Sequence, residues 1–403
     1  SVNNFRLSLK HSTGFHKIQK YNLKYNTSPE EKMVTSETKR ETPKFDWFIP
    51  IDGDGHHIGT AEAERPPTFE YLKEVVQTAE KEGFYSLLIP TRFANGLFDQ
   101  NSPLAETWTM VTALAAVTTK IRFLVAVRPG FISTGLFAQM AATLDQISQG
   151  RLDINIVPGG IQGDFERFGE KTDHSKRYER AEEFIAACRK LWETPAPVSF
   201  TGDSINLDGA VCSPGPHGDP SFYIGGASES ALNLSARQGD TYLAWILPKE
   251  ILGPHLEKTK MIHEKSGRPA RFGLRTHIIV RDKEEDAWDA SKELLSLTDK
   301  SVAEQRQTTF KGTPMVGQKS QSKRYEDHRV GNHLWNGIST VRVNCGTAIV
   351  GNPEQVADEL LGYWKLGIDE FILSGYPHVE ECSRVSESVL PILREKINLA
   401  SNS

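Results

Sequence analysis

Several features that mark other classes of protein are missing from this sequence of 403 residues. It has only four cysteines, which lie too far apart for the paired spacing of a metal site, namely Cys188, Cys212, Cys345 and Cys382. We therefore expect free thiols in a reducing compartment. No apolar run approaches the roughly 18–20 residues that cross a bilayer, so we expect a soluble protein with no membrane partner.

The charge balance has no excess of positive charge. Lys and Arg number 47, Asp and Glu number 52, and the net charge is −5. Nothing in the bulk electrostatics therefore favours binding to nucleic acid, and a small anionic ligand would need local basic residues. Hydrophobic residues make up 38% of the chain, which suffices for a sizeable core and excludes disorder throughout.

Common catalytic motifs are absent as well. The chain has no Walker-type phosphate loop, no Gly-x-Gly-x-x-Gly after its first strand, no Gly-x-Ser-x-Gly elbow and no His-Glu-x-x-His. These absences argue against a Rossmann-type nicotinamide enzyme and leave hydrolytic chemistry without a motif. The turn at residues 52–57 holds Asp and His together, but no third ligand stands at helical spacing, so we expect no metal.

From Phe45 onward the chain alternates between short apolar runs and helical periods. The runs are expected strands, because most end at Gly or Pro before an amphipathic segment begins. They cover residues 45–51, 86–90, 122–127, 152–157, 222–224, 241–245, 272–280 and 370–374. This pattern predicts an α/β fold that closes as a TIM (β/α)8 barrel with insertions, although an open doubly wound sheet has the same local pattern.

Three segments depart from the alternation. Residues 198–214 alternate in polarity between turn residues, which predicts a hairpin. Residues 298–336 are polar, which is typical of a lid or binding loop, or of a disordered one. Residues 1–44 form an N-terminal extension ahead of a barrel over residues 45–399. Because the first 29 residues carry five Lys or Arg and no Asp or Glu, we expect either a mitochondrial transit peptide or a disordered tail on a cytoplasmic protein.

A basic pair lies in the expected strand 272–280. Arg275 and His277 are two apart and so point to the same side. A cation on the interior face of a barrel needs a partner or a ligand, because an unpaired buried charge is costly. Two interpretations stay open: an Arg–carboxylate pair between strands, or an anion pocket completed by Lys323 or Arg324 from the polar segment.

Glycine-rich turns follow two other strands. Residues 225–228 (Gly-Gly-Ala-Ser) open a helix, so their backbone N–H groups and the helix dipole can hold a phosphate. Gly159 and Gly160 follow the strand that contains Asn155, and we expect both turns to face the same barrel mouth. Glycines at such turns also serve tight packing.

Several stretches together resemble the flavin-dependent alkanesulfonate monooxygenases of the bacterial luciferase-like superfamily. The matching segments are 48–60 (FIPIDGDGHHIGT), 123–129 (FLVAVRP), 141–151 (AATLDQISQGR), 173–179, 223–228, 272–280, 346–351 and 373–378. The resemblance spans residues 45–393. It implies a TIM barrel that binds reduced FMN (FMNH2) from a separate NAD(P)H-dependent flavin reductase and activates dioxygen. It also implies that an organosulfonate is oxidatively desulfonated to an aldehyde and sulfite.

The resemblance also implies which residues act and suggests a homo-oligomer. The sulfonate-pocket and catalytic positions fall on Arg275, His277, Tyr376 and His378, and the mobile-loop arginine falls on Arg324. The flavin contacts fall on Asn155, Tyr178, Gly226, Ala227 and Ser228.

Two departures from the family concern the expected mouth. The family's cysteine after the second strand has no counterpart in residues 91–108, and Pro158 stands where a small hydroxyl residue is usual. Both bear on the substrate more than on the reaction, and a bulkier or more polar sulfonate is an alternative. Two other functions stay open: another flavin or deazaflavin oxidoreductase of the superfamily, and a non-catalytic flavin-binding barrel.

Overall fold

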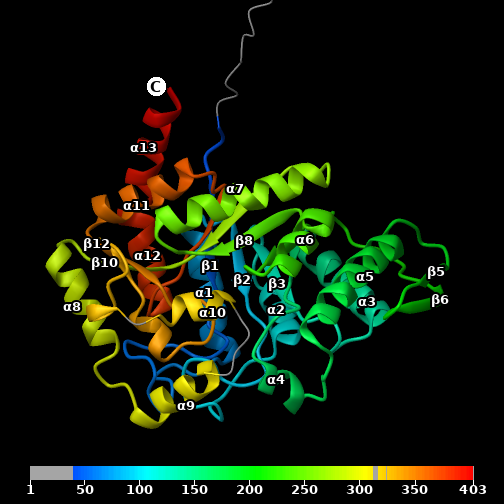
Figure 1. Ribbon diagram of the computed structural model, residues 1–403, viewed down its shortest axis with the longest axis horizontal. Coiled ribbons are helices and arrows are strands. Elements are labelled where there is room, and N and C mark those ends of the chain that lie inside the picture. The colour runs from blue at the N-terminus through cyan, green and yellow to red at the C-terminus, as the bar shows by residue number, and fades with distance from the viewer. Residues whose placement is uncertain (1–39, 312–315, 324, 403) are drawn as a thin grey trace, which may run out of the picture. The chain divides into compact units, whose positions relative to one another are not determined.

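Eight parallel strands close into a barrel in the computed structural model, which describes residues 40–311, 316–323 and 325–402. Around the barrel the order is β1 (Lys44–Phe48), β13 (Glu370–Ile372), β9 (Phe272–Arg275), β8 (Thr241–Trp245), β7 (Phe222–Gly225), β4 (Leu152–Ile156), β3 (Arg122–Val127) and β2 (Ser86–Ile89). Figure 1 shows helices surrounding these strands. The predicted TIM barrel is therefore confirmed, and the open sheet is excluded.

Helices pack around the barrel, and most of them form because their apolar residues recur on one face. They are α1 (Phe69–Lys81), α2 (Thr107–Ala116), α3 (Thr134–Ser148), α5 (His174–Trp192), α6 (Glu229–Gln238), α7 (Lys249–Lys265), α11 (Pro353–Lys365), α12 (His378–Ser388) and α13 (Leu390–Asn402). In α1 the buried positions are Leu72, Val75, Val76 and Ala79. Thr68 caps the same helix by accepting a hydrogen bond from the Tyr71 N–H. None of the helices in the described part of the chain has the length and apolarity that a bilayer crossing requires.

A layer of side chains fills the inside of the barrel. Six strands contribute one buried residue each to this layer, which consists of Phe48, Leu88, Leu124, Tyr223, Leu243 and Ile372. Packed interior layers of this kind make a TIM barrel a solid core with its pocket at one end. The larger core lies outside the strands, between the barrel and its helices.

The predicted strand 272–280 is wrong as a single element, because the chain leaves the barrel at Thr276. Strand β9 stays in the barrel, whereas β10 (His277–Val280) pairs with β12 (Ala348–Gly351) in a separate three-stranded sheet with β11 (Leu334–Trp335). The His277 N–H accordingly donates to the Thr347 carbonyl, 3.1 Å away. An unbroken apolar run carries no signal of such a transfer between sheets.

Of the two predicted insertions, 198–214 and 298–336, only the first has the predicted structure. The predicted hairpin is confirmed as the antiparallel pair β5 (Val198–Thr201) and β6 (Asn206–Ala210). The described part of the polar segment 298–336 is largely helical, so its expectation as a loop is wrong there. It contains α9 (Lys300–Lys311), α10 (Val316–Gln321) and the 3-10 turn η1 (Glu326–His328). Two further helices, α4 (Gln162–Arg167) and α8 (Glu284–Leu294), and the 3-10 turn η2 (Gly337–Thr340) complete the described elements.

Candidate functional site

A cavity of about 470 Å³ opens at the carboxyl ends of the barrel strands. Four members of the interior layer form its floor, namely Phe48, Leu88, Leu243 and Ile372. The loops after β2, β3, β4 and β7 form one side of its wall, and α10 contributes Val316, Gly317, Ser320 and Gln321 to another. This volume lies in the range of sites that bury a small molecule or a cofactor ring.

All five predicted flavin contacts line this cavity. They are Asn155, Tyr178, Gly226, Ala227 and Ser228. The Ser228 side chain caps α6 by accepting a hydrogen bond from the Ala231 N–H at 3.3 Å. The turn therefore sits at the N-terminus of a ten-residue helix, where the free N–H groups and the helix dipole favour an anion.

The backbone of this turn requires glycine at Gly226. Its φ is +124°, and a Cβ there would lie only 2.9 Å from the Cβ of Ala231. Tyr178 stands on the opposite side, with its hydroxyl 3.5 Å from the same Cβ position and 3.1 Å from that of Gly159. Burial raises the pKa of Tyr178, although a hydrogen bond with Ser228 opposes the rise. The Tyr178 phenol is therefore a neutral group between the two glycine-rich turns.

Arg275 ends β9 and reaches the cavity. Its Nη2 donates to Ser374 Oγ at 2.8 Å, its Nη1 donates to the Thr276 carbonyl, and its guanidinium lies 4.5 Å from the Phe48 ring centroid. Among the described residues no carboxylate forms an ion pair with it, which leaves the interpretation as an Arg–carboxylate pair without support there. Burial lowers the pKa of Arg275 to about 10, so the side chain remains charged at neutral pH.

His277 lies behind Arg275 and shares Ser374 with it. The His277 Nε2 lies 3.0 Å from the Cys345 carbonyl, which can only accept, so Nε2 carries the ring proton. His277 Nδ1 then accepts from the Ser374 hydroxyl at 2.8 Å. Burial, reinforced by Arg275 and Arg342, lowers the pKa of His277 well below its usual value. A neutral imidazole therefore fixes Ser374, and Ser374 in turn orients Arg275.

Tyr376 and His378 pack behind the same wall and do not line the cavity. The Tyr376 ring stacks on His277 with centroids 5.5 Å apart and meets His378 edge-on at 5.0 Å. The backbone N–H of His378 donates to Asp54 Oδ2 at 2.6 Å. The structure thus gathers four of the five predicted catalytic residues, but only Arg275 faces the cavity.

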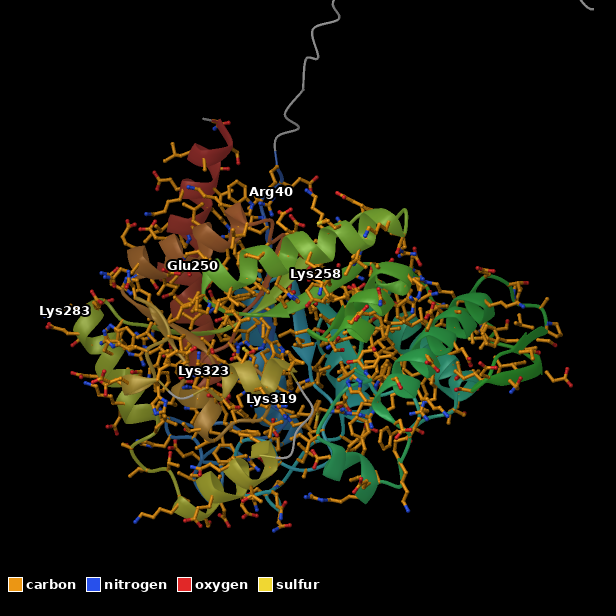
Figure 2. The ribbon with its side chains drawn as sticks, in the orientation of Figure 1. Arg40, Glu250, Lys258, Lys283, Lys319 and Lys323 are labelled. Carbon is orange, nitrogen blue, oxygen red and sulfur yellow. The ribbon has the colours of Figure 1, made fainter. Side chains whose placement is uncertain are left out.

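The fifth predicted residue, Arg324, lies outside the described residues. Its neighbour Lys323, labelled in Figure 2, is exposed, with Nζ 5.3 Å from the Tyr325 ring centroid. Lys323 is not among the residues that line the cavity. Arg342 occupies the wall instead. Its Nη1 donates to the Tyr376 hydroxyl at 3.1 Å, and its Nε donates to the Cys345 carbonyl at 3.1 Å.

Sequence reasoning missed three arginines of this cavity, namely Arg92, Arg128 and Arg342. Arg128 directly follows the predicted strand 122–127, and this position at the end of a strand indicates a place at the barrel mouth. Arg342 follows η2 in a segment with no strand or helix pattern, and nothing in its surroundings marks it.

The cavity has an excess of positive charge among its described lining residues. Four arginines line it, and none of its lining residues in the described part of the chain is an Asp or a Glu. Arg92 has a carboxylate partner, since its Nε lies 2.8 Å from Asp52 Oδ2. Within the described residues no cluster of three or more His, Cys, Asp or Glu is placed to hold a metal ion. The cavity therefore favours an anion bound by arginine side chains.

Comparison with known proteins agrees with the barrel fold. Residues 43–370 match the family model described as luciferase-like monooxygenase. Similar solved structures include a riboflavin lyase with modified FMN and substrate riboflavin (20% identity, TM-score 0.72, 88% of this chain and 92% of that one). A long-chain alkane monooxygenase (20%, 0.70, 89% and 92%) and the EDTA monooxygenase of Chelativorans sp. BNC1 (17%, 0.68, 88% and 94%) are also similar. The chain belongs to the luciferase-like monooxygenase family.

Proposed function

We propose that this protein is a two-component, FMNH2-dependent monooxygenase that desulfonates an organosulfonate to an aldehyde and sulfite. The observation that carries the proposal is the pair of buried guanidiniums, Arg275 and Arg342, in a cavity wall that has no carboxylate among its described residues. Burying such charges without a counterion is costly unless a ligand supplies one. A sulfonate supplies a permanent negative charge and three acceptor oxygens.

The residues of the Gly226 turn fit reduced FMN. The free N–H groups at the start of α6 suit its phosphate, while Asn155 and Tyr178 offer polar contacts on the adjoining wall. When bound, FMNH2 supplies two electrons for the reduction of dioxygen. We propose a separate NAD(P)H-dependent reductase as its source, because no dinucleotide-binding motif follows the first strand.

The reaction balances without any further reactant. An organosulfonate, dioxygen and FMNH2 give an aldehyde, sulfite, FMN, water and one proton. One oxygen atom enters the aldehyde and the other leaves as water, and the C–S bond breaks with its electron pair on sulfite. In this scheme Arg275 and Arg342 hold the sulfonate and balance the charge that grows on departing sulfite.

The buried groups behind the wall position these guanidiniums. The Tyr376 hydroxyl accepts from Arg342, and burial raises the pKa of Tyr376 so that the phenol stays neutral. Ser374 accepts from Arg275, as described above. The donors aimed at the substrate are therefore fixed before it binds, which is the arrangement that stabilises developing charge most effectively.

Sulfite release from a panel of sulfonates, from methanesulfonate to sugar sulfonates, tests this function. The assay contains the full chain, FMN, NADH, a generic flavin reductase and air. We expect sulfite from one class of compound and none without dioxygen. Turnover with a deazaflavin in the absence of dioxygen would instead assign hydride transfer. Tight flavin binding without oxidation of any compound would assign a non-catalytic barrel.

A further inference from the structure

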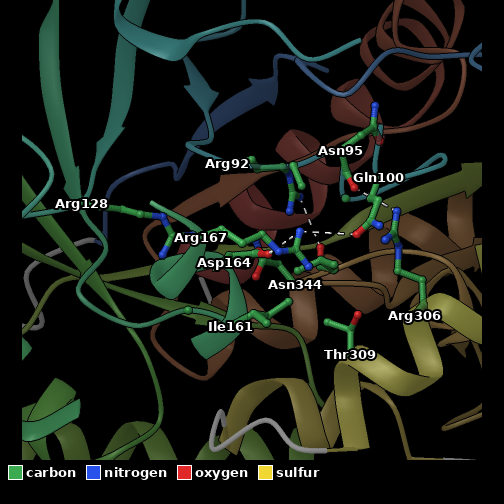
Figure 3. A pocket seen from close by; sticks show the side chains of 14 residues that line it. Arg92, Asn95, Gln100, Arg128, Ile161, Asp164, Arg167, Arg306, Thr309 and Asn344 are labelled. Atoms are coloured by element: carbon green, nitrogen blue, oxygen red, sulfur yellow. Dashed lines mark hydrogen bonds and ion pairs between the residues drawn. The ribbon is translucent and has the colours of Figure 1, made fainter. Parts of the chain in front are cut away.

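A second, smaller cavity of about 30 Å³ lies beside the large one. Figure 3 shows arginine side chains converging on it from several elements, with Asn95, Gln100 and Asn344 among them. A cavity of about 10–15 Å³ is large enough to hold one water molecule. The space therefore suits a small polar group such as a carboxylate and is too small for a ring.

The small cavity has a net positive charge. Four guanidiniums line it, those of Arg92, Arg128, Arg167 and Arg306. Asp164 is the only carboxylate among its described lining residues, and Asp52 pairs with Arg92 from behind. Four positive and two negative charges leave a net charge of +2 within a few side chains.

Two of these cations, Arg306 and Arg128, are held in position by uncharged groups. Arg306 is buried, and its Nε and Nη2 donate to the carbonyls of Val341 and Asn95, both at 3.0 Å. Arg128 donates to the Gly159 carbonyl at 2.6 Å and lies over the rings of Phe93 and Phe165. Main-chain carbonyls and aromatic faces thus hold Arg306 and Arg128 without neutralising them, whereas Arg92 pairs with Asp52 and Arg167 lies 3.7 Å from Asp164 Oδ1.

Arg128 also has an unsatisfied donor. Its Nε is buried and has no hydrogen-bond partner among the described residues. Burial, reinforced by the neighbouring Arg92, lowers the pKa of Arg128 to about 10. A buried cation among other cations, with a donor left over, is the environment that an incoming anion stabilises most.

The two cavities adjoin each other and share part of their walls. Arg92, Arg128, Gly160 and Asn344 line both of them. The positive field of Arg92 also acts on Arg275 on one side and on Arg306 on the other. One extended molecule in the large cavity can therefore place one end at Arg275 and another at the small cavity.

We propose that the small cavity binds a second anionic group of the substrate, so that the substrate is a dianion with a sulfonate at one end and a carboxylate or second sulfonate at the other. The identity of the first group rests on the proposed function. In the proposed function the flavin phosphate binds the helix N–H groups of the Gly226 turn, which leaves the arginine pocket to the substrate.

The test compares propane-1-sulfonate with 3-sulfopropanoate, which share a three-carbon chain and differ by a terminal carboxylate. The readout is the ratio of kcat/KM for the dianion to kcat/KM for the monoanion, measured by sulfite release. We expect the wild-type protein to prefer the dianion by about tenfold or more, the effect of one charge-assisted contact. Arg128→Met keeps the packing between the two phenylalanines and is expected to lower this ratio about tenfold.

A second variant keeps the inference testable if Arg128→Met fails to fold. Arg167 lies on α4 with 55% of its side chain exposed, so Arg167→Gln is expected to fold normally and lower the ratio by a smaller factor. The matched control is Arg237→Gln, whose side chain is 51% exposed on α6 and pairs with Glu182. The control is expected to keep the wild-type ratio.

Three results would overturn the inference. The first is equal kcat/KM for both compounds in the wild-type protein, and the second is an unchanged ratio in Arg128→Met. The third is a weaker Kd for FMN in Arg128→Met with an equal loss for both compounds, which would assign the pocket to the flavin phosphate.

The absence of sulfite from both compounds would count against the proposed function instead. The inference is then tested by titrating each compound into the FMNH2-loaded protein without dioxygen. Tighter binding of 3-sulfopropanoate that Arg128→Met abolishes would support it, and equal binding would refute it.

Discussion

Among single residues, Arg275 carries the most weight in the proposed chemistry. Arg275→Met keeps the length of the side chain but removes its charge and its donors. We expect KM for the sulfonate to rise about tenfold or more, whereas Kd for FMN changes less than about twofold, since the Gly226 turn is untouched. Steady-state sulfite release and flavin fluorescence titration measure the two quantities. Arg237→Met on the outer face of α6 is the control. An equal loss of flavin affinity would mean that Arg275 holds the cofactor.

His277 makes the folded protein sensitive to acid. It is neutral in the native state, because burial and two neighbouring arginines keep its pKa well below the usual value. The unfolded chain takes up a proton on this residue near pH 6.5. The corresponding stability is therefore present above pH 6.5 and is lost as the pH falls toward the native pKa.

His277→Gln is expected to remove this part of the acid sensitivity. Urea midpoints measured at pH 8 and pH 5.5 should differ more in the wild-type protein than in the variant. His56→Gln, at a side chain that is 61% exposed, serves as the control and is expected to keep the wild-type difference. A variant with the full wild-type difference would show that His277 is already charged in the native state.

The sequence predicted some of these residues and not others, for physical reasons. Arg275 and His277 were paired by strand alternation, and they do share a partner, although that partner is Ser374 and the strand breaks between them. Arg342 reaches the cavity only through tertiary packing of the segment after η2. No local period records that packing.

Among the elements, the β7–α6 turn is the most constrained. In Gly226→Ala a left-handed φ of +124° and a Cβ contact of 2.9 Å with Ala231 must both be relieved. We expect the turn to shift and Kd for FMN to rise by about tenfold, with a lower Tm. Fluorescence titration and calorimetry are the measurements.

Gly163→Ala provides a matched control for this substitution. Gly163 lies in α4, and a Cβ there meets no atom within 4 Å. Alanine also favours helix, so this variant is expected to keep the wild-type affinity and at least the wild-type Tm. Equal FMN affinity in Gly226→Ala and Gly163→Ala would show that the β7–α6 turn does not bind the flavin phosphate.

The polar segment 298–336 shows where element prediction failed. Its helices bury polar side chains, Arg306, Gln318 and Gln321, and satisfy them with hydrogen bonds. Gln321, for example, donates to the Ile246 carbonyl at 2.9 Å and accepts from the Gly346 N–H at 3.1 Å. Helices attached in this way lack an apolar stripe, so a search for hydrophobic periods finds a loop.

At the scale of the whole molecule, the closed barrel predicts where the chain can be shortened. Arg40 donates to the Ile368 carbonyl at 2.7 Å and to Asp369 Oδ1 at 2.9 Å, which ties the start of the described chain to the loop before β13 (Figure 2). We expect a protein that begins at Arg40 to keep the Tm and kcat/KM of the full chain. A protein that begins at Phe45 lacks these contacts and the first residue of β1, and is expected to unfold several degrees lower. Calorimetry measures the Tm of both proteins. An equal Tm would show that Arg40 adds no stability.

The barrel itself was predictable because eight strand-to-helix repeats leave few ways to bury both faces of a parallel sheet. The transfer of β10 to a second sheet was not, since it depends on pairing with β12 far along the chain. The candidate anion site was likewise predictable only in part. Its glycine-rich turn was visible in the sequence, whereas its full set of arginines was visible only in the fold.

A crystal structure with FMN and 3-sulfopropanoate, grown without a reductant, tests the central claim most directly. We predict the flavin phosphate at the N–H groups of residues 226–228, the sulfonate against Arg275 and Arg342, and the carboxylate among Arg92, Arg128 and Arg306. A phosphate bound by Arg275 and Arg342, with no sulfonate in the cavity, would contradict the assignment of this site to desulfonation.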